Sequence, residues 1–168
     1  MGTTGSFTIL RARPSDAEQI AEFVAEATHG RVSVTADSVL ERFGAKGLWL
    51  VRDADGGIVG LAGWRAENLV ARIDDFLIYP FDLYPSAGRR LVESIEATAQ
   101  ELQCEAVMLF VPAGASSTLI SFFESRGYVR PELEALPRFW QDTVQEATAQ
   151  GRYIMMRQLR EDLVMRPI

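Results

Sequence analysis

Three consecutive strand patterns stand between helical segments, and this order restricts the possible folds more than any other feature of the sequence. The patterns cover Leu48–Arg52, Ile58–Arg65 and Val70–Tyr79, with turn residues at Asp53–Gly57 and Glu67–Asn68 between them. A doubly wound parallel sheet alternates strands with helices, so three hairpin-linked strands in a row exclude it. The order instead predicts a mixed α/β sheet with helices on both faces.

The remaining segments supply further strands and the helices that would cover such a sheet. Ala106–Val111 is apolar throughout, as expected of a central strand that is buried on both faces. Before the three hairpin-linked strands we expect a strand at Phe7–Ala12, a helix that begins at a Ser15–Glu18 capping box, and a short helix capped by Thr35 and ended by Gly44. Two more helices are expected on either side of Ala106–Val111: a long one with Leu91, Ile95, Ala99 and Leu102 on one face, and one with Leu119, Ile120 and Phe123 that ends at Gly127. The chain then continues with an extended piece from Tyr128, an extra helix over Pro137–Gln150 and a last strand at Tyr153–Leu159. We therefore expect six to seven strands in a single domain over residues 1–168.

Composition excludes several classes of function. With 17 basic against 23 acidic residues the chain has a net charge of −6, which argues against nucleic acid as the main partner. A single cysteine, Cys104, and a single histidine, His29, exclude a disulfide framework and a multi-thiolate or poly-histidine metal centre, although not a metal held by carboxylates. We expect no metal. There is no apolar run near the ~20 residues of a membrane helix, and no signal-peptide pattern at the start. We expect a cytoplasmic protein without membrane contact.

The most informative stretch runs from a strand through a proline loop into a helix that begins with small residues. Ser86, Ala87 and Gly88 precede Arg89 and Arg90 at the start of this helix. The first turn of a helix leaves unpaired N–H groups and carries partial positive charge, so it binds anions such as phosphate. Taken alone, the chemistry of this loop favours an ordinary strand-to-helix connection with two solvated arginines.

The element order and this loop together resemble the GNAT superfamily of acetyl-CoA-dependent N-acetyltransferases. The central motif of that family has a valine and a proline at the positions of Ile78 and Pro80, and two glycines at those of Ser86 and Gly88. Leu83 stands where arginine or glutamine is usual. In the family, amides of this loop bind the cofactor pyrophosphate and the preceding strand binds the pantetheine arm. The resemblance implies acetyl-CoA as co-substrate, with cofactor-binding residues Leu77, Ile78, Tyr79, Leu83, Tyr84, Pro85, Ser86, Ala87, Gly88, Arg89, Arg90 and Ser116.

A second segment of the chain resembles another motif of the family. Ser116, Phe122–Phe123 and Gly127–Tyr128 match an asparagine, a phenylalanine–tyrosine pair and a glycine–phenylalanine pair. The tyrosine of this motif protonates the departing thiolate in many members, and Phe123 has no proton to give. Phe123 therefore implies either unassisted departure of the thiolate or a residue that only packs in the core.

Two carboxylates, Asp74 and Asp75, are the candidates for a general base. They are adjacent on a strand, so their side chains point to opposite faces, and one of them would face an acceptor amine. Arg72 occupies the position that best matches the usual base of the family. An ion pair between Arg72 and one of these aspartates is the alternative to catalysis.

These observations support two hypotheses about function. The first is an N-acetyltransferase that moves an acetyl group from acetyl-CoA to a small-molecule or peptide amine by direct attack in a ternary complex. The second is a catalytically inactive GNAT-like domain that binds acyl-CoA or another partner. His29 falls in a segment that usually lines the acceptor site in the family, although a lone loop histidine is more often solvated. Trp140 on the extra helix is predicted to mark a dimer contact, and hence a homodimer, or an acceptor lid.

Overall fold

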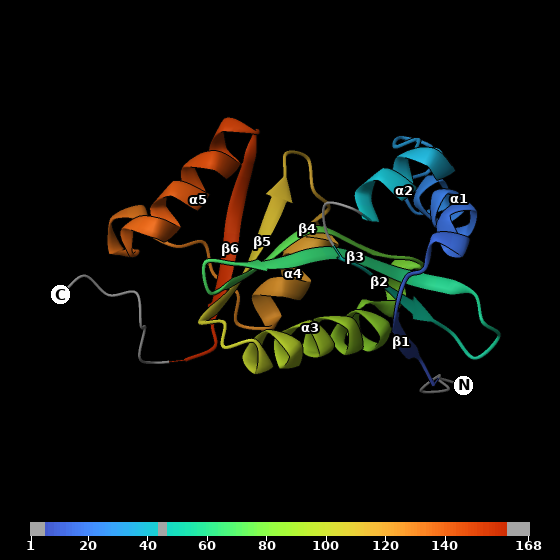
Figure 1. Cartoon of the computed structure of the whole chain (residues 1–168), viewed down its shortest axis with the longest axis horizontal. Helices are drawn as coiled ribbons and strands as arrows, with labels where there is room; N and C mark the ends of the chain where they lie inside the picture. Colours follow the sequence, from blue (N-terminus) through green and yellow to red (C-terminus); the bar gives the residue numbers. More distant parts are fainter. Residues whose placement is uncertain (1–5, 44–46, 161–168) are drawn as a thin grey trace. The chain divides into compact units, whose positions relative to one another are not determined.

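The computed structural model describes residues 6–43 and 47–160. Gly44, the expected end of the second helix, and the first five residues lie outside this part of the chain. The strands form one six-stranded mixed sheet in the order β1-β2-β3-β4-β5-β6 (Figure 1). The chain divides into two compact units, residues 1–65 with 75–94 and residues 66–74 with 95–168.

The helices and strands follow the order expected from the sequence. They are β1 (Thr8–Arg11), α1 (Ala17–Ala27), α2 (Ala36–Phe43), β2 (Gly47–Arg52), β3 (Ile58–Glu67), β4 (Val70–Ile78), α3 (Arg89–Glu101), β5 (Ala106–Pro112), α4 (Ser117–Ser125), α5 (Arg138–Ala149) and β6 (Arg152–Gln158). Short 3₁₀ turns precede α1 and α5, and a 3₁₀ turn followed by a π-helical turn connects β4 to α3.

The pairing of the strands confirms the mixed sheet. β1 and β2 are antiparallel, as are β2 and β3, and β5 and β6. β4 and β5 are parallel neighbours, with a register that runs from Val70 opposite Ala106 to Ile73 opposite Leu109. The Asp53 carboxylate accepts hydrogen bonds from the amides of Asp55 and Gly57, which forms the turn between β2 and β3.

In the first unit, α1 and α2 cover one face of the sheet. Ile20, Phe23 and Val24 on α1 pack with Leu50 on β2 and Leu61 on β3 in one apolar cluster. The Thr35 hydroxyl accepts a hydrogen bond from the Ser38 amide at 3.1 Å, which confirms Thr35 as the cap of α2. Leu77 and Tyr79 pack against the same cluster, so the carboxyl end of β4 lies beside these two helices.

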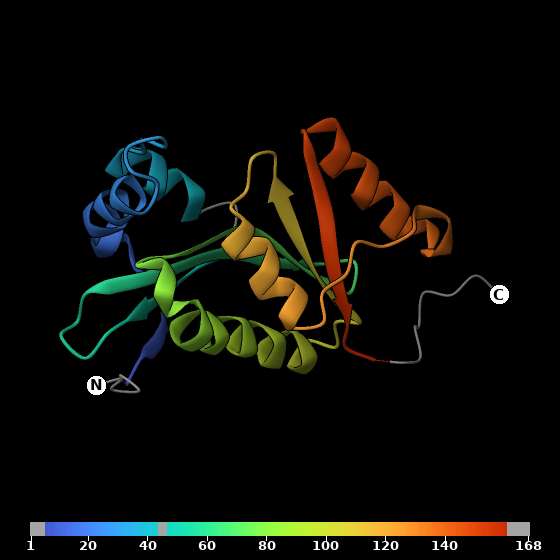
Figure 2. The same ribbon diagram turned by 180° about the vertical axis from the view of Figure 1, so that it is seen from behind.

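In the second unit, α5 packs on one face of β5 and β6. Alternate residues of β5, Ala106, Met108 and Phe110, share an apolar cluster with Trp140 and Ala147 of α5. α4 lies on the side of β5 that faces the viewer in Figure 2 and is turned away in Figure 1. β5 is buried from Ala106 to Val111, as its composition predicted.

Four details differ from the sequence analysis. The predicted capping box at Ser15 is wrong, because the Asp16 carboxylate instead accepts a hydrogen bond from the Arg13 amide at 2.8 Å. Leu102 was assigned to the inner face of α3, but the helix ends at Glu101 and Leu102 is 54% exposed. The extended piece after Gly127 amounts to a single bridge between Val129 and Met156. Trp140, predicted to mark a dimer contact or a lid, is fully buried under α5 and offers neither.

Candidate functional site

The segment from the end of β4 to the start of α3 forms a tightly wound connection. Phe81–Leu83 is one turn of 3₁₀ helix, and Tyr84–Gly88 is one π-helical turn that continues into α3 at Arg89. The amide of Leu83 donates to the carbonyl of Pro80 at 3.0 Å, which closes the first turn. The predicted strand–loop–helix arrangement is therefore present, with its helical part beginning at Tyr84.

Small residues occupy the first helical turn, as the sequence indicated. Ala87 and Gly88 are buried, whereas Ser86 is half-buried and its hydroxyl donates to the carbonyl of Leu83 at 3.3 Å. The amide of Arg89 already donates to carbonyl oxygens within this turn. The amides with no acceptor inside a helix are those of its first turn, so the candidate anion-binding groups lie before Arg89.

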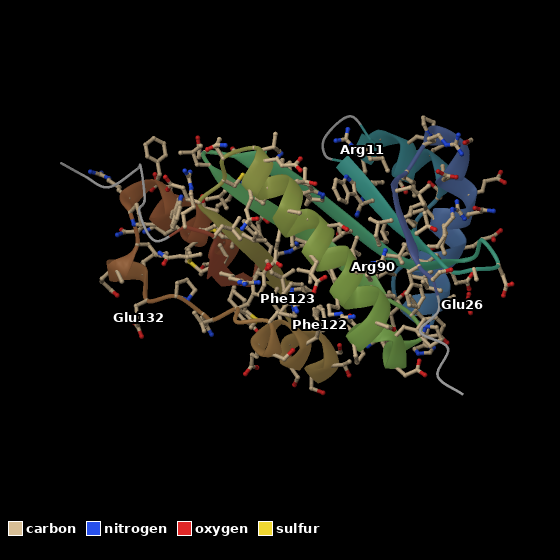
Figure 3. All side chains as sticks on the ribbon, turned by 90° about the horizontal axis from the view of Figure 1, so that it is seen from below. Arg11, Glu26, Arg90, Phe122, Phe123 and Glu132 are labelled. Carbon is tan, nitrogen blue, oxygen red and sulfur yellow. The ribbon has the colours of Figure 1, made fainter. Side chains whose placement is uncertain are left out.

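Arg89 and Arg90, the two arginines of this segment, are both exposed. A guanidinium nitrogen of Arg90 donates to the carbonyl of Phe7 at 3.2 Å, which ties α3 to the residue before β1. Figure 3 shows Arg90 on α3 and Arg11 on the neighbouring N-terminal strand. A role for Arg89 and Arg90 in binding a phosphate stays a prediction.

Tyr84 is the buried anchor of the connection. Its side chain is 4% exposed and its ring centroid lies 6.3 Å from that of Phe76 on β4. Burial raises the pKa of Tyr84 to about 12, and a backbone hydrogen bond at Ile78 opposes this rise. Tyr84 therefore connects the helical turn to the last residue of β4, and it is protonated at neutral pH.

The two candidate bases have different partners. Asp75 forms an ion pair with Arg42 of α2 at 3.1 Å, and its side chain is 23% exposed. Asp74 belongs to the other unit, where its carboxylate lies 4.0 Å from the guanidinium of Arg72. The ion pair that the sequence suggested for Arg72 is therefore present, although the catalytic role of Asp74 and Asp75 stays a prediction.

Arg72 on β4 is a buried arginine whose charge is met by partly exposed carboxylates. Its guanidinium lies 4.4 Å from the ring centroid of Phe110 and within 3.4 Å of carboxylate oxygens of Glu67 and Glu146. Arg152 donates to the carbonyl of Asp74 at 3.0 Å. Arginine side chains are not deprotonated in proteins, so this position cannot supply a general base, and the hydrogen bonds of Arg72 to Glu146 connect β4 to α5.

The segment of the second motif has a clear structural role. The Ser116 hydroxyl caps α4 by accepting a hydrogen bond from the Leu119 amide at 3.2 Å. Phe123 is fully buried, with its ring centroid 4.9 Å from Tyr128 and 5.3 Å from Phe122, and Figure 3 labels both phenylalanines. The Tyr128 hydroxyl donates to Glu96 at 2.9 Å, and burial raises its pKa above the ordinary value. These contacts support core packing as the role of Phe123.

The structure also brings together three aromatic rings that the sequence analysis did not connect. His29, after α1, lies 5.9 Å from Tyr79 and 6.4 Å from Phe81, measured between ring centroids. Tyr79 and Phe81 are 5.6 Å apart. His29 and Tyr79 are 50 residues apart in sequence, so no local pattern could have predicted this cluster.

Residues 6–43 and 47–160 contain no cluster of three or more acidic, histidine or cysteine side chains able to hold a metal ion. Within the same ranges, none of the helices combines the length and the apolar character needed to cross a membrane.

Solved structures share this fold over nearly the whole chain. Ard1 from Thermoplasma volcanium is 21% identical, with a TM-score of 0.67 over 92% of this chain and 99% of that one. The ribosomal-protein-S18-alanine N-acetyltransferase of Escherichia coli is 15% identical, with a TM-score of 0.68 over 97% and 100% of the two chains. A putative acetyltransferase, yncA from Salmonella typhimurium, solved with acetyl-CoA, is 16% identical, with a TM-score of 0.66 over 96% and 99%.

The fold is therefore that of the GNAT N-acetyltransferases, as the sequence resemblance implied. No protein-family model and no curated protein matches the chain by sequence. This agrees with the departures at Leu83, Ser86, Ser116 and Phe123, which weaken both motifs while leaving the backbone arrangement in place.

Proposed function

We propose that this protein is an N-acetyltransferase that transfers the acetyl group of acetyl-CoA to an amine acceptor. The observation that carries the proposal is the helical turn Tyr84–Gly88 between β4 and α3, within a fold shared with a protein solved with acetyl-CoA. Its first-turn amides form an anion site that depends on the backbone, so it survives the replacement of a glycine by Ser86.

The chain supplies binding and orientation in this proposal. The first-turn amides bind the pyrophosphate, and the carboxyl end of β4 orients the thioester beside the acceptor. The amine nitrogen attacks the thioester carbonyl, a C–N bond forms, the C–S bond breaks, and the proton lost by the amine balances the one gained by the thiolate. Holding both reactants in place contributes much of the rate, and with Phe123 buried the thiolate leaves without a tyrosine donor.

A charge placed in the first helical turn tests this site. Ser86→Asp adds a carboxylate where the pyrophosphate would bind, and an acidic residue at a helix N-terminus is favourable for folding. We expect acetyl-CoA affinity, measured by calorimetry, to fall at least ten-fold, because like charges a few ångströms apart repel by about 4 kcal/mol at an effective dielectric constant of 20. Gln100→Glu, which adds the same charge at an exposed position near the end of α3, is the control.

The outcomes separate the two functions considered for this fold. Equal affinities of parent and Ser86→Asp for acetyl-CoA would refute the loop assignment. Binding of acetyl-CoA by the parent without coenzyme A release across a panel of amines would favour the inactive acyl-CoA-binding domain. The acceptor, whether a small molecule or a peptide, the cytoplasmic location and the homodimer remain predictions within this proposal.

A further inference from the structure

Three aromatic rings from two loops of the first unit are in contact. They belong to His29, Tyr79 and Phe81, and we call them the three-ring surface. His29 follows α1, while Tyr79 and Phe81 flank Pro80 at the end of β4. All three pairs of rings meet edge to face, with interplanar angles of 83°, 67° and 89°. Edge-to-face contacts at these distances are direct, so the rings form one continuous aromatic surface.

This surface is open to solvent. Phe81 is 39% exposed, and His29 is exposed as well. Tyr79 is half-buried because its inner side packs on the cluster beneath α1 and α2. An exposed apolar patch in a fixed position is a feature of binding surfaces.

The backbone holds the rings in place before any ligand arrives. His29 has a φ of +52°, and its amide donates to the carbonyl of Glu26 at 3.2 Å. The amide of Gly30 donates to Ala25 at 2.8 Å, and that of Tyr79 to Val59 of β3 at 3.0 Å. A surface built in this way loses little conformational entropy on binding.

The charges around the rings favour a cation. The carboxylates of Glu26, in the last turn of α1, and Asp82, next to Phe81, are both exposed, and Figure 3 shows Glu26 on this helix. The carbonyl end of a helix carries partial negative charge. Arg31 is the opposing charge in this loop, and its Nε donates to the carbonyl of Thr28 at 3.2 Å.

We propose that the three-ring surface binds the aromatic group of an arylalkylamine, and that this compound is the acetyl acceptor. The inference rests on the proposed function, because Tyr79 ends the strand that would orient the thioester. The ring of the acceptor packs on His29 and Phe81, and its ammonium is attracted by the nearby carboxylates. The ammonium first loses one proton to solvent, and the neutral amine then attacks the thioester carbonyl; the C–N bond forms, the C–S bond breaks, and the second proton of the nitrogen passes to the thiolate. The products are the N-acetyl arylalkylamine, coenzyme A with its thiol protonated, and one proton in solvent.

The test compares 2-phenylethylamine with 2-cyclohexylethylamine, which has a similar size but no aromatic ring. We expect kcat/KM for coenzyme A release to be about ten-fold higher with the aromatic amine, mainly through KM, since aromatic pairs gain stability beyond their area. Phe81→Ala should reduce this preference to less than two-fold without changing acetyl-CoA affinity. Phe139→Ala, which removes another exposed phenylalanine from α5, should retain it.

A second measurement does not depend on turnover. His29 is the only histidine of the chain, so its imidazole protons give an assignable pair of NMR signals that report directly on the surface. Titration at constant pH should give at least five-fold tighter binding of the aromatic amine, and Phe81→Ala should remove this difference. Equal affinities of both amines at His29 would overturn the inference. Tight aromatic binding without any acetyl transfer would retain the surface and refute the proposed function.

Discussion

Replacing Gly60 by alanine puts a methyl group where the sheet has no room for one. Gly60 lies on β3 opposite Val51 of β2. A Cβ atom at this position would lie 2.8 Å from Val51 Cγ2 and 2.9 Å from Ile78 Cδ1, closer than such atoms approach in real proteins. Val51 and Ile78 are almost completely buried, so neither side chain has space into which it can turn.

The expected cost follows from two opposing effects. Overpacking a well-packed core by one methyl group costs about 1–3 kcal/mol, and removing a glycine from a strand returns about 0.5–1 kcal/mol. We expect Gly60→Ala to lower the free energy of unfolding by about 1–2 kcal/mol. With a typical urea dependence of about 2 kcal/mol/M, the unfolding midpoint falls by roughly 0.5–1 M.

A matched control is available at the start of β2. A Cβ on Gly47 would meet only the carbonyl oxygen of Trp64 at 3.5 Å and Trp49 Nε1 at 3.9 Å, which are ordinary contacts. Gly47→Ala should therefore leave stability unchanged or raise it by up to about 1 kcal/mol. Adding Val51→Ala to Gly60→Ala should restore part of the loss, as expected for residues in contact. Equal midpoints for the two glycine variants would refute the packing argument.

Two further predictions concern single aromatic residues. Phe123 is fully buried against Phe122 and Tyr128, so Phe123→Tyr places a hydroxyl in the packed core, and we expect it to lower the free energy of unfolding by about 1–3 kcal/mol without raising coenzyme A release. A variant that releases coenzyme A faster than the parent would show that the hydroxyl reaches the thiolate, and would contradict core packing as the role of Phe123. Tyr84→Phe should change the pH dependence of stability in alkali. Since burial raises the pKa of Tyr84 from 10.0 to about 12, the unfolded chain binds fewer protons than the folded one between these values. Stability therefore falls as pH rises through this range, by about 2.3 kcal/mol at pH 12. Urea unfolding at pH 8 and pH 12 should show a smaller fall for the variant, and an identical fall would contradict this assignment.

Local sequence patterns determined the order of elements and the position of the loop. Ala106–Val111 could be assigned to a central strand because a short run that is apolar throughout is typical of a strand buried on both faces. The small residues Ser86–Gly88 predicted a helix start whose backbone amides are not covered by bulky side chains. This prediction needed only local sequence, because the side chains and the amides of one helical turn are close neighbours in the chain. The three hairpin-linked strands were enough to exclude a doubly wound sheet, because turn chemistry and alternation act between residues close in sequence.

Contacts between distant residues were decided only by the tertiary structure. The sequence of α5 does not show whether Trp140 faces solvent or the sheet. Trp140 is buried because α5 packs on the apolar face of β5 and β6. Asp75 pairs with Arg42, 33 residues away, and the approach of α2 to β4 that brings them together has no local signature. His29 meets Tyr79 and Phe81 because the ends of α1 and β4 converge on one cluster. Side chains far apart in sequence become neighbours only when the packed core positions the elements that carry them.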